Sequence, residues 1–309
     1  MSSYPKTLLE AVAYFSDQER MMAYLIEMRW PNGIACPECG CLEPMYLSTR
    51  KIWKCRGCYK QFSVKVGTIF EKSPIPLQKW LIAMWLIVNA KNGISSYELH
   101  RSLGVTQKTA WFMLHRIRVA LQNGSIERLS NIVEADETYV GGKVSNKHLW
   151  QRKAHHERGH KGGASGKTVV VGVLERGGKI AAQVVAKPDR STLLNIMLKH
   201  VKPETQVMTD QNPGYDYVKQ FYKHDVINHA TTYVKDNVHT NGVENFWSLL
   251  KRSLKGTYVC VSPVHLNQYV SEQVFRFNTR KDNDRERFIK ATSQIMGVRL
   301  TYAKLTGKA

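Results

Sequence analysis

A chain of 309 residues with 43% hydrophobic residues is long enough for two or three domains and too apolar to be a disordered protein. Its 45 Lys and Arg against 25 Asp and Glu give a formal net charge of +20, which favours a polyanionic partner, nucleic acid before an anionic membrane. The longest apolar run, 80–90, is too short to cross a bilayer and no signal peptide opens the chain, so we expect a soluble, cytoplasmic protein with no membrane partner.

The first segment, 1–33, is predicted to be helical. Residues 5–30 favour helix, and Ser16 to Glu19 have the pattern of a capping box in front of "RMMAYLIEMRW". The turn-forming residues 31–33 end this segment.

Two Cys-x-x-Cys pairs within residues 34–72 predict a metal site. Fifteen residues separate the pairs, and the sequence between them fits a short hairpin. Four thiolates at this spacing suit one structural, tetrahedral Zn²⁺, with each pair supplied by a tight turn. We therefore predict a zinc ribbon, with Cys41 and Cys260 outside its ligand set. The four predicted ligands are Cys36, Cys39, Cys55 and Cys58.

Residues 73–125 carry the spacing of a helix-turn-helix. A short helix at 95–102 precedes a turn at Gly104, and Thr106 can cap a second helix. The second helix would enter the major groove of DNA with its N-terminal residues at the base edges. The residues predicted to contact DNA there are Gln107, Lys108 and Thr109.

From 126 to 262 strands alternate with helices, which predicts an α/β domain with a mixed sheet. A basic, Gly-rich stretch, 143–167, is expected to be a mobile loop. Its histidines, His155, His156 and His160, are expected to contact phosphates or solvent instead of a metal ion. The remaining residues, 263–309, are expected to form a mostly helical, polar tail. The expected strands are 131–140, 168–175, 179–186, 205–209 and 225–228, and the expected helices are 190–200, 212–223 and 240–254.

Three carboxylates of this domain occupy positions that suit metal ligands. Asp136 lies in the first strand, Asp210 ends a later strand, and Glu244 lies on a helix. Together they could hold two Mg²⁺ or Mn²⁺ ions, which stabilise the attacking and leaving oxygens of a displacement at phosphorus. On the helical stripe of Glu244, Lys251 and Lys255 could contact DNA phosphates.

Five motifs spread over nearly the whole chain resemble one known family. They are "CPEC…CRGC", "GTIFEKSPIPLQKW", "EADETYVGGK", "TDQNPGY" and "HTNGVENFWSLLKR". Together they resemble the prokaryotic insertion-sequence transposases of the IS1595 group, with a zinc ribbon in front of an ISXO2-like catalytic domain. The resemblance implies an RNase H-like fold, a DDE-type mechanism and a nucleoid-associated protein. It also implies the triad Asp136, Asp210 and Glu244, with Lys251 as the associated basic residue.

Two positions of this triad have rivals nearby in the sequence. Some members of the group carry Asn as the third residue, and Asn245 is adjacent to Glu244; helical geometry favours Glu244, because Asn245 lies about 100° off its stripe. On the first strand, Glu137 is expected to point to the opposite face from Asp136, whereas Glu134 shares that face but lies deeper. We therefore assign Asp136.

The predicted function is DNA transposition. The enzyme would bind terminal inverted repeats through its zinc ribbon and helix-turn-helix, hydrolyse a phosphodiester at each element end, and join the freed 3′-OH to target DNA. A homodimer or higher oligomer on double-stranded DNA is expected, because two ends must be processed together. Two alternatives remain open: an RNase H-like nuclease without strand transfer, and a zinc-ribbon DNA-binding regulator with an inactive catalytic domain.

Overall fold

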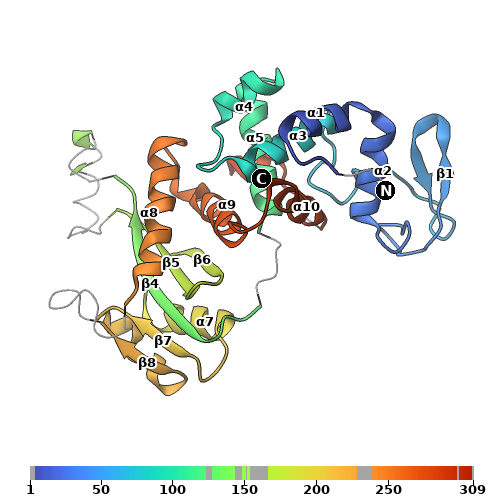
Figure 1. Ribbon diagram of the computed structural model, residues 1–309. Coiled ribbons are helices and arrows are strands. Elements are labelled where there is room, and N and C mark those ends of the chain that lie inside the picture. Colours follow the sequence, from blue (N-terminus) through green and yellow to red (C-terminus); the bar gives the residue numbers. More distant parts are fainter. Residues whose placement is uncertain are drawn as a thin grey trace. The chain divides into compact units, whose positions relative to one another are not determined.

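The computed structural model divides the chain into two compact units (Figure 1). One unit comprises Met1–Gly124 and Thr279–Ala309, and the other comprises Ser125–Asn278. No helix in the described part of the chain is both long and apolar enough to cross a membrane. Most of the expected basic loop, with His155, His156 and His160, lies outside the described residues, which are 4–122, 127–142, 148–150, 152–153, 166–227, 239–297 and 299–307.

Two helices open the first unit: α1 (Leu8–Ser16) and α2 (Gln18–Arg29). Asp17 separates them and caps α2, because its Oδ1 accepts a hydrogen bond from the backbone N–H of Glu19 at 2.9 Å. The capping box expected to begin at Ser16 is therefore wrong: Ser16 is the last residue of α1, and the cap is the carboxylate that follows it.

A three-stranded antiparallel sheet follows, with strands β1 (Met45–Leu47), β2 (Ile52–Lys54) and β3 (Gln61–Phe62) in that order. The first two strands form the expected hairpin between the cysteine pairs. Aromatic rings supply the core of this small sheet. Trp53 is 2% exposed, stacks on Phe62 at 5.9 Å and meets Trp30 at 5.4 Å.

The rest of the first unit is helical: α3 (Leu77–Asn89), α4 (Ser96–Leu103), α5 (Gln107–Ala120), α10 (Asp284–Ser293) and α11 (Tyr302–Thr306). α4 and α5 form the expected helical pair. Gly104 occupies the turn at φ 58°, a left-handed conformation that favours glycine. Thr106 caps α5, as predicted, by accepting a hydrogen bond from the backbone N–H of Thr109 at 3.2 Å.

The C-terminal segment completes the first unit through α10, which packs against α3. Phe288 of α10 is 1% exposed, and its ring lies 5.6 Å from Phe15, 5.8 Å from Tyr24 and 5.1 Å from Trp85. The region 263–309, expected to be one polar tail, thus divides between the units and carries core residues in both.

The second unit is built on a five-stranded mixed sheet in the order β6-β5-β4-β7-β8, which confirms the expected mixed sheet. β4, β5 and β6 pair antiparallel, whereas β7 and β8 run parallel to β4. The strands are β4 (Ile132–Val140), β5 (Thr168–Glu175), β6 (Ile180–Val185), β7 (Gln206–Thr209) and β8 (Lys223–Val226).

Helices cover both faces of this sheet (Figure 1). α7 (Arg190–His200) packs on the face that carries Val133 and Ala135 of β4. On the opposite face, α8 (Asn241–Gly256) and α9 (Leu266–Asn278) pack on Val170 and Leu174 of β5. The helix expected over 212–223 is wrong. Pro213-Gly214 limits the helical structure there to two short 3₁₀ turns, η3 (Pro213–Tyr215) and η4 (Val218–Gln220).

We predict that Phe288→Ala destabilises the first unit by about 3 kcal/mol, because it removes a buried ring from an aromatic cluster and leaves a cavity. Phe221→Ala is the matched control, since Phe221 is 45% exposed, and it should change the free energy of unfolding by less than about 0.5 kcal/mol. Denaturant titrations of both variants measure the difference. A loss of less than about 0.5 kcal/mol in Phe288→Ala would show that this ring contributes little to the stability of the first unit.

Candidate active site and zinc site

A group of three carboxylates lies where β4 and β7 run side by side. Parallel pairing sets Ala135 opposite Thr209, so the residues that follow them are neighbours: Asp136 in the middle of β4 and Asp210 just past the end of β7. One carboxylate oxygen from each of Asp136, Asp210 and Glu137 lies within 4.8 Å of the others. The structure thus brings two of the predicted triad residues together and adds Glu137.

Glu137 joins this group from the other face of the sheet. Asp136 faces α8, where it meets Trp247, and Glu137 faces the η3 side, so the expected alternation along β4 holds. The Glu137 carboxylate accepts hydrogen bonds from the Asn212 side chain and, at 3.2 Å, from the Tyr215 hydroxyl. Because Asp210 lies just past the end of β7, side chains from both faces of β4 can reach it. Alternation alone therefore did not identify Glu137 as a neighbour.

Burial and repulsion by neighbouring carboxylates disfavour the charged forms of Asp136 and Glu137. Burial raises the pKa of Asp136 to about 7, with Asp210 and Glu137 adding to the shift and the hydrogen bond from Trp247 opposing it. Burial also raises the pKa of Glu137, against the hydrogen bond from Asn212. A divalent cation among the oxygens would remove this repulsion, and hard carboxylate oxygens are the ligands that Mg²⁺ and Mn²⁺ prefer. The three residues therefore fit such an ion.

Glu134 has a different role, as the attachment point for α8. Its side chain is fully buried; Oε1 accepts from Arg176 Nε at 2.9 Å, and Oε2 accepts from the backbone N–H of Val243 at 3.0 Å. It thereby satisfies a backbone N–H in the first turn of α8, and its carboxylate lies at the N-terminal end of this helix, which carries the positive end of the helix dipole. A Cβ at Gly242 would lie 2.7 Å from Glu134 Oε2, so only glycine permits this approach.

Trp247 makes the second attachment of α8 and was not identified from the sequence. Its Nε1 donates to Asp136 Oδ2 at 2.9 Å. The indole ring lies over Gly172, the β5 partner of Asp136, where a Cβ would stand 2.7 Å from the ring. The sequence signal was Gly172 itself, a glycine in the middle of a Val-rich strand, which often marks a close approach by another group.

The remaining predicted residues lie along the exposed stripe of α8. Glu244 is exposed in the first turn, one turn before Trp247, and Thr240 Oγ1 donates to its Oε1 at 3.4 Å. Among the described residues it is not part of the three-carboxylate group. Lys251, Lys255 and Asn245 are also exposed. The stripe expected from the helical period is confirmed, with the apolar residues of α8 buried on the other side.

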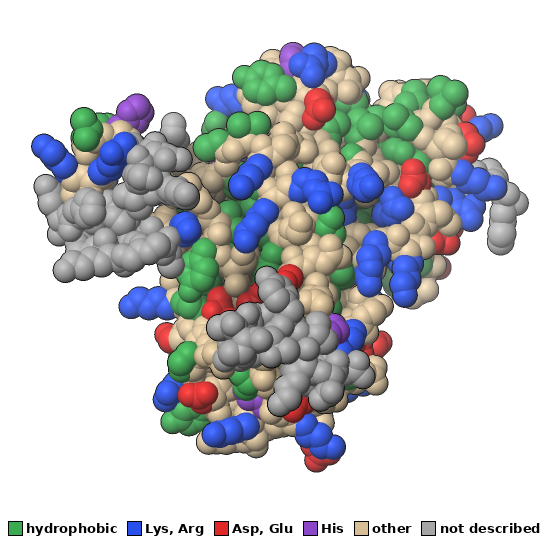
Figure 2. All heavy atoms as spheres, turned by 60° about the vertical axis from the view of Figure 1, so that its left-hand side comes forward, with side chains coloured by type: hydrophobic (Ala, Val, Ile, Leu, Met, Phe, Trp, Pro, Cys, Tyr) green, Lys and Arg blue, Asp and Glu red, His purple; other side chains and the backbone are tan. Residues whose placement is uncertain are grey.

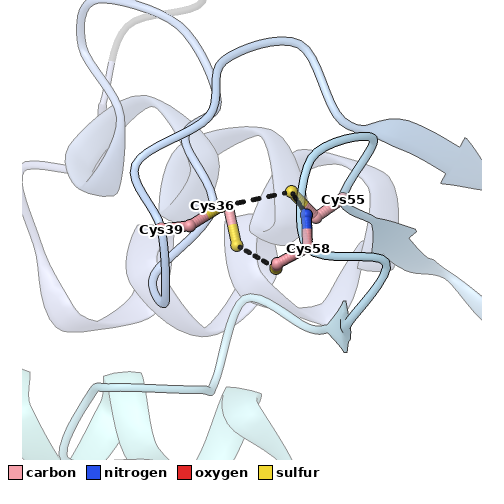
Figure 3. Close-up of side chains that lie close together, drawn as sticks. All are labelled: Cys36, Cys39, Cys55 and Cys58. Atoms are coloured by element: carbon pink, nitrogen blue, oxygen red, sulfur yellow. Dashed lines mark hydrogen bonds between the residues drawn. The ribbon is translucent and has the colours of Figure 1, made fainter.

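The second candidate site is the cysteine cluster of the first unit (Figure 3). One sulfur from each of Cys36, Cys39, Cys55 and Cys58 lies within 4.8 Å of the others, and two cross-pairs are 3.7 and 3.5 Å apart. With a Zn–S distance of about 2.3 Å, tetrahedral sulfurs would lie about 3.8 Å from one another. The cluster therefore fits one Zn²⁺, held by the four predicted cysteines.

Backbone N–H groups stabilise the thiolate form of Cys55, which is the form that binds a metal ion. The N–H groups of Cys58 and Gly57 donate to Cys55 Sγ at 3.4 and 3.3 Å and lower the pKa of Cys55 to about 6, although burial opposes them. Cys41 lies outside the four-sulfur group, as expected, and its Sγ donates to the carbonyl of Leu42 at 3.5 Å.

The predicted base-reading residues of α5 make contacts within the protein. Gln107 Nε2 donates to Ser96 Oγ at 2.9 Å, and the Thr109 hydroxyl lies 2.8 Å from that of Thr106. Lys108 is exposed, with its Nζ 4.9 Å from the centre of the Tyr302 ring. These contacts orient the first turn of α5, and their role in DNA binding stays a prediction.

Cys55→Ser is expected to release zinc and unfold the ribbon, because a structural metal supplies much of the folding free energy of such a module. Zinc content measured by elemental mass spectrometry should fall from one ion per chain to nearly none. Cys41→Ser is the matched control and should retain the ion. Loss of zinc in both variants would place Cys41 among the ligands.

Without divalent cations, Asp136→Asn is expected to stabilise the protein at pH 8 by about 1–3 kcal/mol. The folded pKa of about 7 exceeds the ordinary value of 3.8, so the folded state holds a proton that the unfolded state has released. Wild-type stability therefore falls as pH rises from about 4 to 7, and a neutral Asn avoids this loss. Thermal scans should show a larger gain at pH 8 than at pH 5, and Mg²⁺ should raise the wild-type melting temperature alone. A gain independent of pH would contradict the assignment.

Two family models match the chain, in agreement with these sites. The ISXO2-like transposase domain matches residues 128–278, which contain the three carboxylates and α8. The transposase zinc-ribbon domain of the IS1595 type matches residues 16–61, which contain the four cysteines.

Relatives among known proteins agree with these matches. An "uncharacterized protein in transposable element ISH50" of Halobacterium salinarum is 26% identical over 250 residues, covering 78% of this chain and 84% of that protein. An "uncharacterized transposase-like protein" of Haemophilus influenzae is 34% identical over 101 residues, covering 32% of this chain and 81% of that protein. A solved simian T-cell lymphotropic virus intasome in complex with PP2A regulatory subunit B56 gamma gives 16% identity over 58% of this chain and 63% of that chain. Its TM-score of 0.29 is too low to support an argument. With its zinc-ribbon and ISXO2-like domains, the chain belongs to the IS1595 family of insertion-sequence transposases.

Proposed function

We propose that the protein is a DDE-type DNA transposase that cleaves the ends of its element and joins the freed 3′-OH to target DNA. The observation that carries this proposal is the group of Asp136, Asp210 and Glu137, whose carboxylate oxygens lie within 4.8 Å of one another where the carboxyl end of β7 meets the middle of β4. Carboxylates at the carboxyl ends of strands lie where open α/β sheets build their sites. The strand order, with three antiparallel and two parallel strands, supports an RNase H-like fold for the catalytic domain.

The carboxylates would hold and orient Mg²⁺ or Mn²⁺ at the scissile phosphate. When bound, a pair of such ions stabilises the attacking and leaving oxygens of an in-line displacement. Asp136 and Asp210 would bind from the strands, and Glu244 would complete the set from the first turn of α8. α8 is held beside Asp136 by Glu134 and Trp247, so Glu244 starts from a fixed backbone position.

DNA binding is proposed for both units. The charge of +20 supports contacts to phosphates, and Figure 2 shows Lys and Arg side chains spread over the face in view. Lys251 and Lys255, exposed on α8, would contact phosphates beside the carboxylates. The zinc ribbon and the α4–α5 pair would recognise the terminal inverted repeats, on a homodimer or higher oligomer that holds two DNA ends.

Single substitutions of the acids test the proposal and identify the third catalytic acid. Cleavage of a labelled terminal-repeat duplex should fall about 10³-fold in Asp136→Asn, Asp210→Asn and Glu244→Gln, with DNA affinity nearly unchanged. Asp225→Asn is the matched control, because Asp225 lies on β8 and bonds Gln206 instead of the carboxylate group. If Glu137→Gln abolished cleavage and Glu244→Gln did not, Glu137 would be the third acid.

A pre-cleaved duplex with a free 3′-OH separates the proposal from its alternatives. A transposase joins this end to a target plasmid, and the joined product is visible on a gel. Cleavage of the intact duplex without joining of the pre-cleaved one would support the nuclease alternative. DNA binding with neither reaction would support the regulator alternative.

A further inference from the structure

The turn that follows β7 connects two of the three carboxylates through one residue, Asn212. This turn, 210–215, begins at Asp210 and ends at Tyr215, on the side of β4 that carries Glu137. The backbone N–H of Asn212 donates to Asp210 Oδ1 at 3.1 Å, and its side-chain Nδ2 donates to Glu137 Oε1. Asn212 thus bonds one carboxylate from β4 and the one that lies past the end of β7.

A third hydrogen bond fixes the direction of the Asn212 amide. Its Oδ1 accepts from the backbone N–H of Gly214 at 2.8 Å and so caps the 3₁₀ turn η3, as asparagine side chains commonly do. Because oxygen and nitrogen are the two branches of the amide, Nδ2 faces Glu137. The oxygen, which is the atom of this side chain that could bind a metal ion, faces an N–H group instead. This geometry suits a donor to Glu137 better than a metal ligand.

Tertiary packing holds this turn in place. Tyr215 is 1% exposed, and its hydroxyl donates to Glu137 Oε2 at 3.2 Å. Its backbone N–H donates to the Asn212 carbonyl at 3.0 Å. A Cβ at Gly214 would lie 2.7 Å from Leu193 Cδ1 of α7, so the turn packs closely on that helix. Asn212 therefore presents its donors from a backbone whose position the surrounding structure determines.

These hydrogen bonds are important because the carboxylates that they reach repel each other. Oxygens of Asp210 and Glu137 lie within 4.8 Å of one another. Without a donor, the Glu137 side chain could relieve this repulsion by rotating away from Asp210. A donor to each carboxylate offsets the repulsion and fixes the oxygens before an ion arrives, so less freedom is lost when the ion binds. Residues that orient metal ligands in this way typically change metal affinity by about 10- to 100-fold.

We propose that Asn212 is a positioning residue of the catalytic site, which holds the Glu137 and Asp210 carboxylates at the spacing that a divalent cation requires. It acts through its hydrogen bonds and contacts neither the ion nor the DNA. The inference rests on the proposed function, because it assigns a role in the same metal site, and it adds a residue outside the predicted triad.

Asn212→Ser tests this role, because it removes the donor to Glu137 and keeps the turn. The serine hydroxyl can still accept from the Gly214 N–H, but it is too short to reach Glu137. The affinity of the zinc-loaded, DNA-free protein for Mn²⁺, measured by electron paramagnetic resonance of the unbound ion, should fall about 10-fold. Asn195→Ser is the matched control, because Asn195 is exposed on α7 of the same unit, and it should leave the affinity unchanged. An unchanged affinity in Asn212→Ser would overturn the proposal.

Glu137→Ala distinguishes a positioning residue from a metal ligand. If Asn212 acts through Glu137, Asn212→Ser should cost little further Mn²⁺ affinity in the Glu137→Ala protein, whereas loss of a direct ligand would again cost about 10-fold. Melting temperatures of the zinc-loaded protein without other divalent cations give the same comparison where Mn²⁺ binds too weakly to measure. Asn212→Ser should lower the melting temperature by about 2–4 °C in the wild type and by less than about 1 °C in Glu137→Ala. Equal losses in both backgrounds would contradict the proposal.

The Mg²⁺ dependence of cleavage gives a readout that a loss of folding would not imitate. In Asn212→Ser the Mg²⁺ concentration for half-maximal cleavage of the terminal-repeat duplex should rise about 10-fold. Saturating Mg²⁺ should restore most of the rate, and the Kd for DNA should stay unchanged. A rate that no Mg²⁺ concentration restores would contradict a positioning role. If the wild type cleaved no duplex at all, the proposed function would fail, whereas Mn²⁺ binding and the melting temperatures would still decide the role of Asn212.

Discussion

Repulsion among three partly buried carboxylates is the constraint on which the second unit depends. Carboxylate oxygens of Asp136, Glu137 and Asp210 lie within 4.8 Å of one another, and burial together with this proximity raises the pKa of Asp136 to about 7. Such a group costs folding free energy unless a cation, a proton or hydrogen bonds compensate it. The surrounding structure supplies the hydrogen bonds, from Trp247 to Asp136 and from Asn212 and Tyr215 to Glu137. The remaining cost is what a metal ion would relieve.

Trp247, which compensates Asp136, acts together with Glu134 to position α8 beside the carboxylates. Trp247 bonds Asp136 and packs over Gly172, and Glu134 bonds the backbone at the start of α8. Apolar residues on one side of α8 bury it against the sheet, so its exposed stripe, with Glu244 at one end and Lys251 and Lys255 further along, has a fixed direction.

The first unit consists of a small ribbon and a set of helices, each of which has few core residues of its own. The ribbon is held together by its four clustered cysteines, which fit one Zn²⁺, and by the contacts of Trp53 with Phe62 and Trp30. The helices around α3 gain their core partly from α10, a segment that follows the catalytic domain in the sequence. Both ends of the chain thus contribute to one unit, so the first unit gains its full core only when the segment after Asn278 packs onto it.

The sequence by itself determined the features that depend on local spacing. The zinc ligands, the turn at Gly104, the cap at Thr106 and the two faces of α8 all follow from residues near one another in the chain. Only the tertiary structure decided which distant groups meet. Glu137 joins Asp136 despite pointing to the other face, because Asp210 projects past the end of a neighbouring strand. Trp247 likewise meets Asp136 because the pairing of β4 with β5 sets Gly172 beside Asp136 and leaves room for the indole ring, and no local pattern encodes this pairing register.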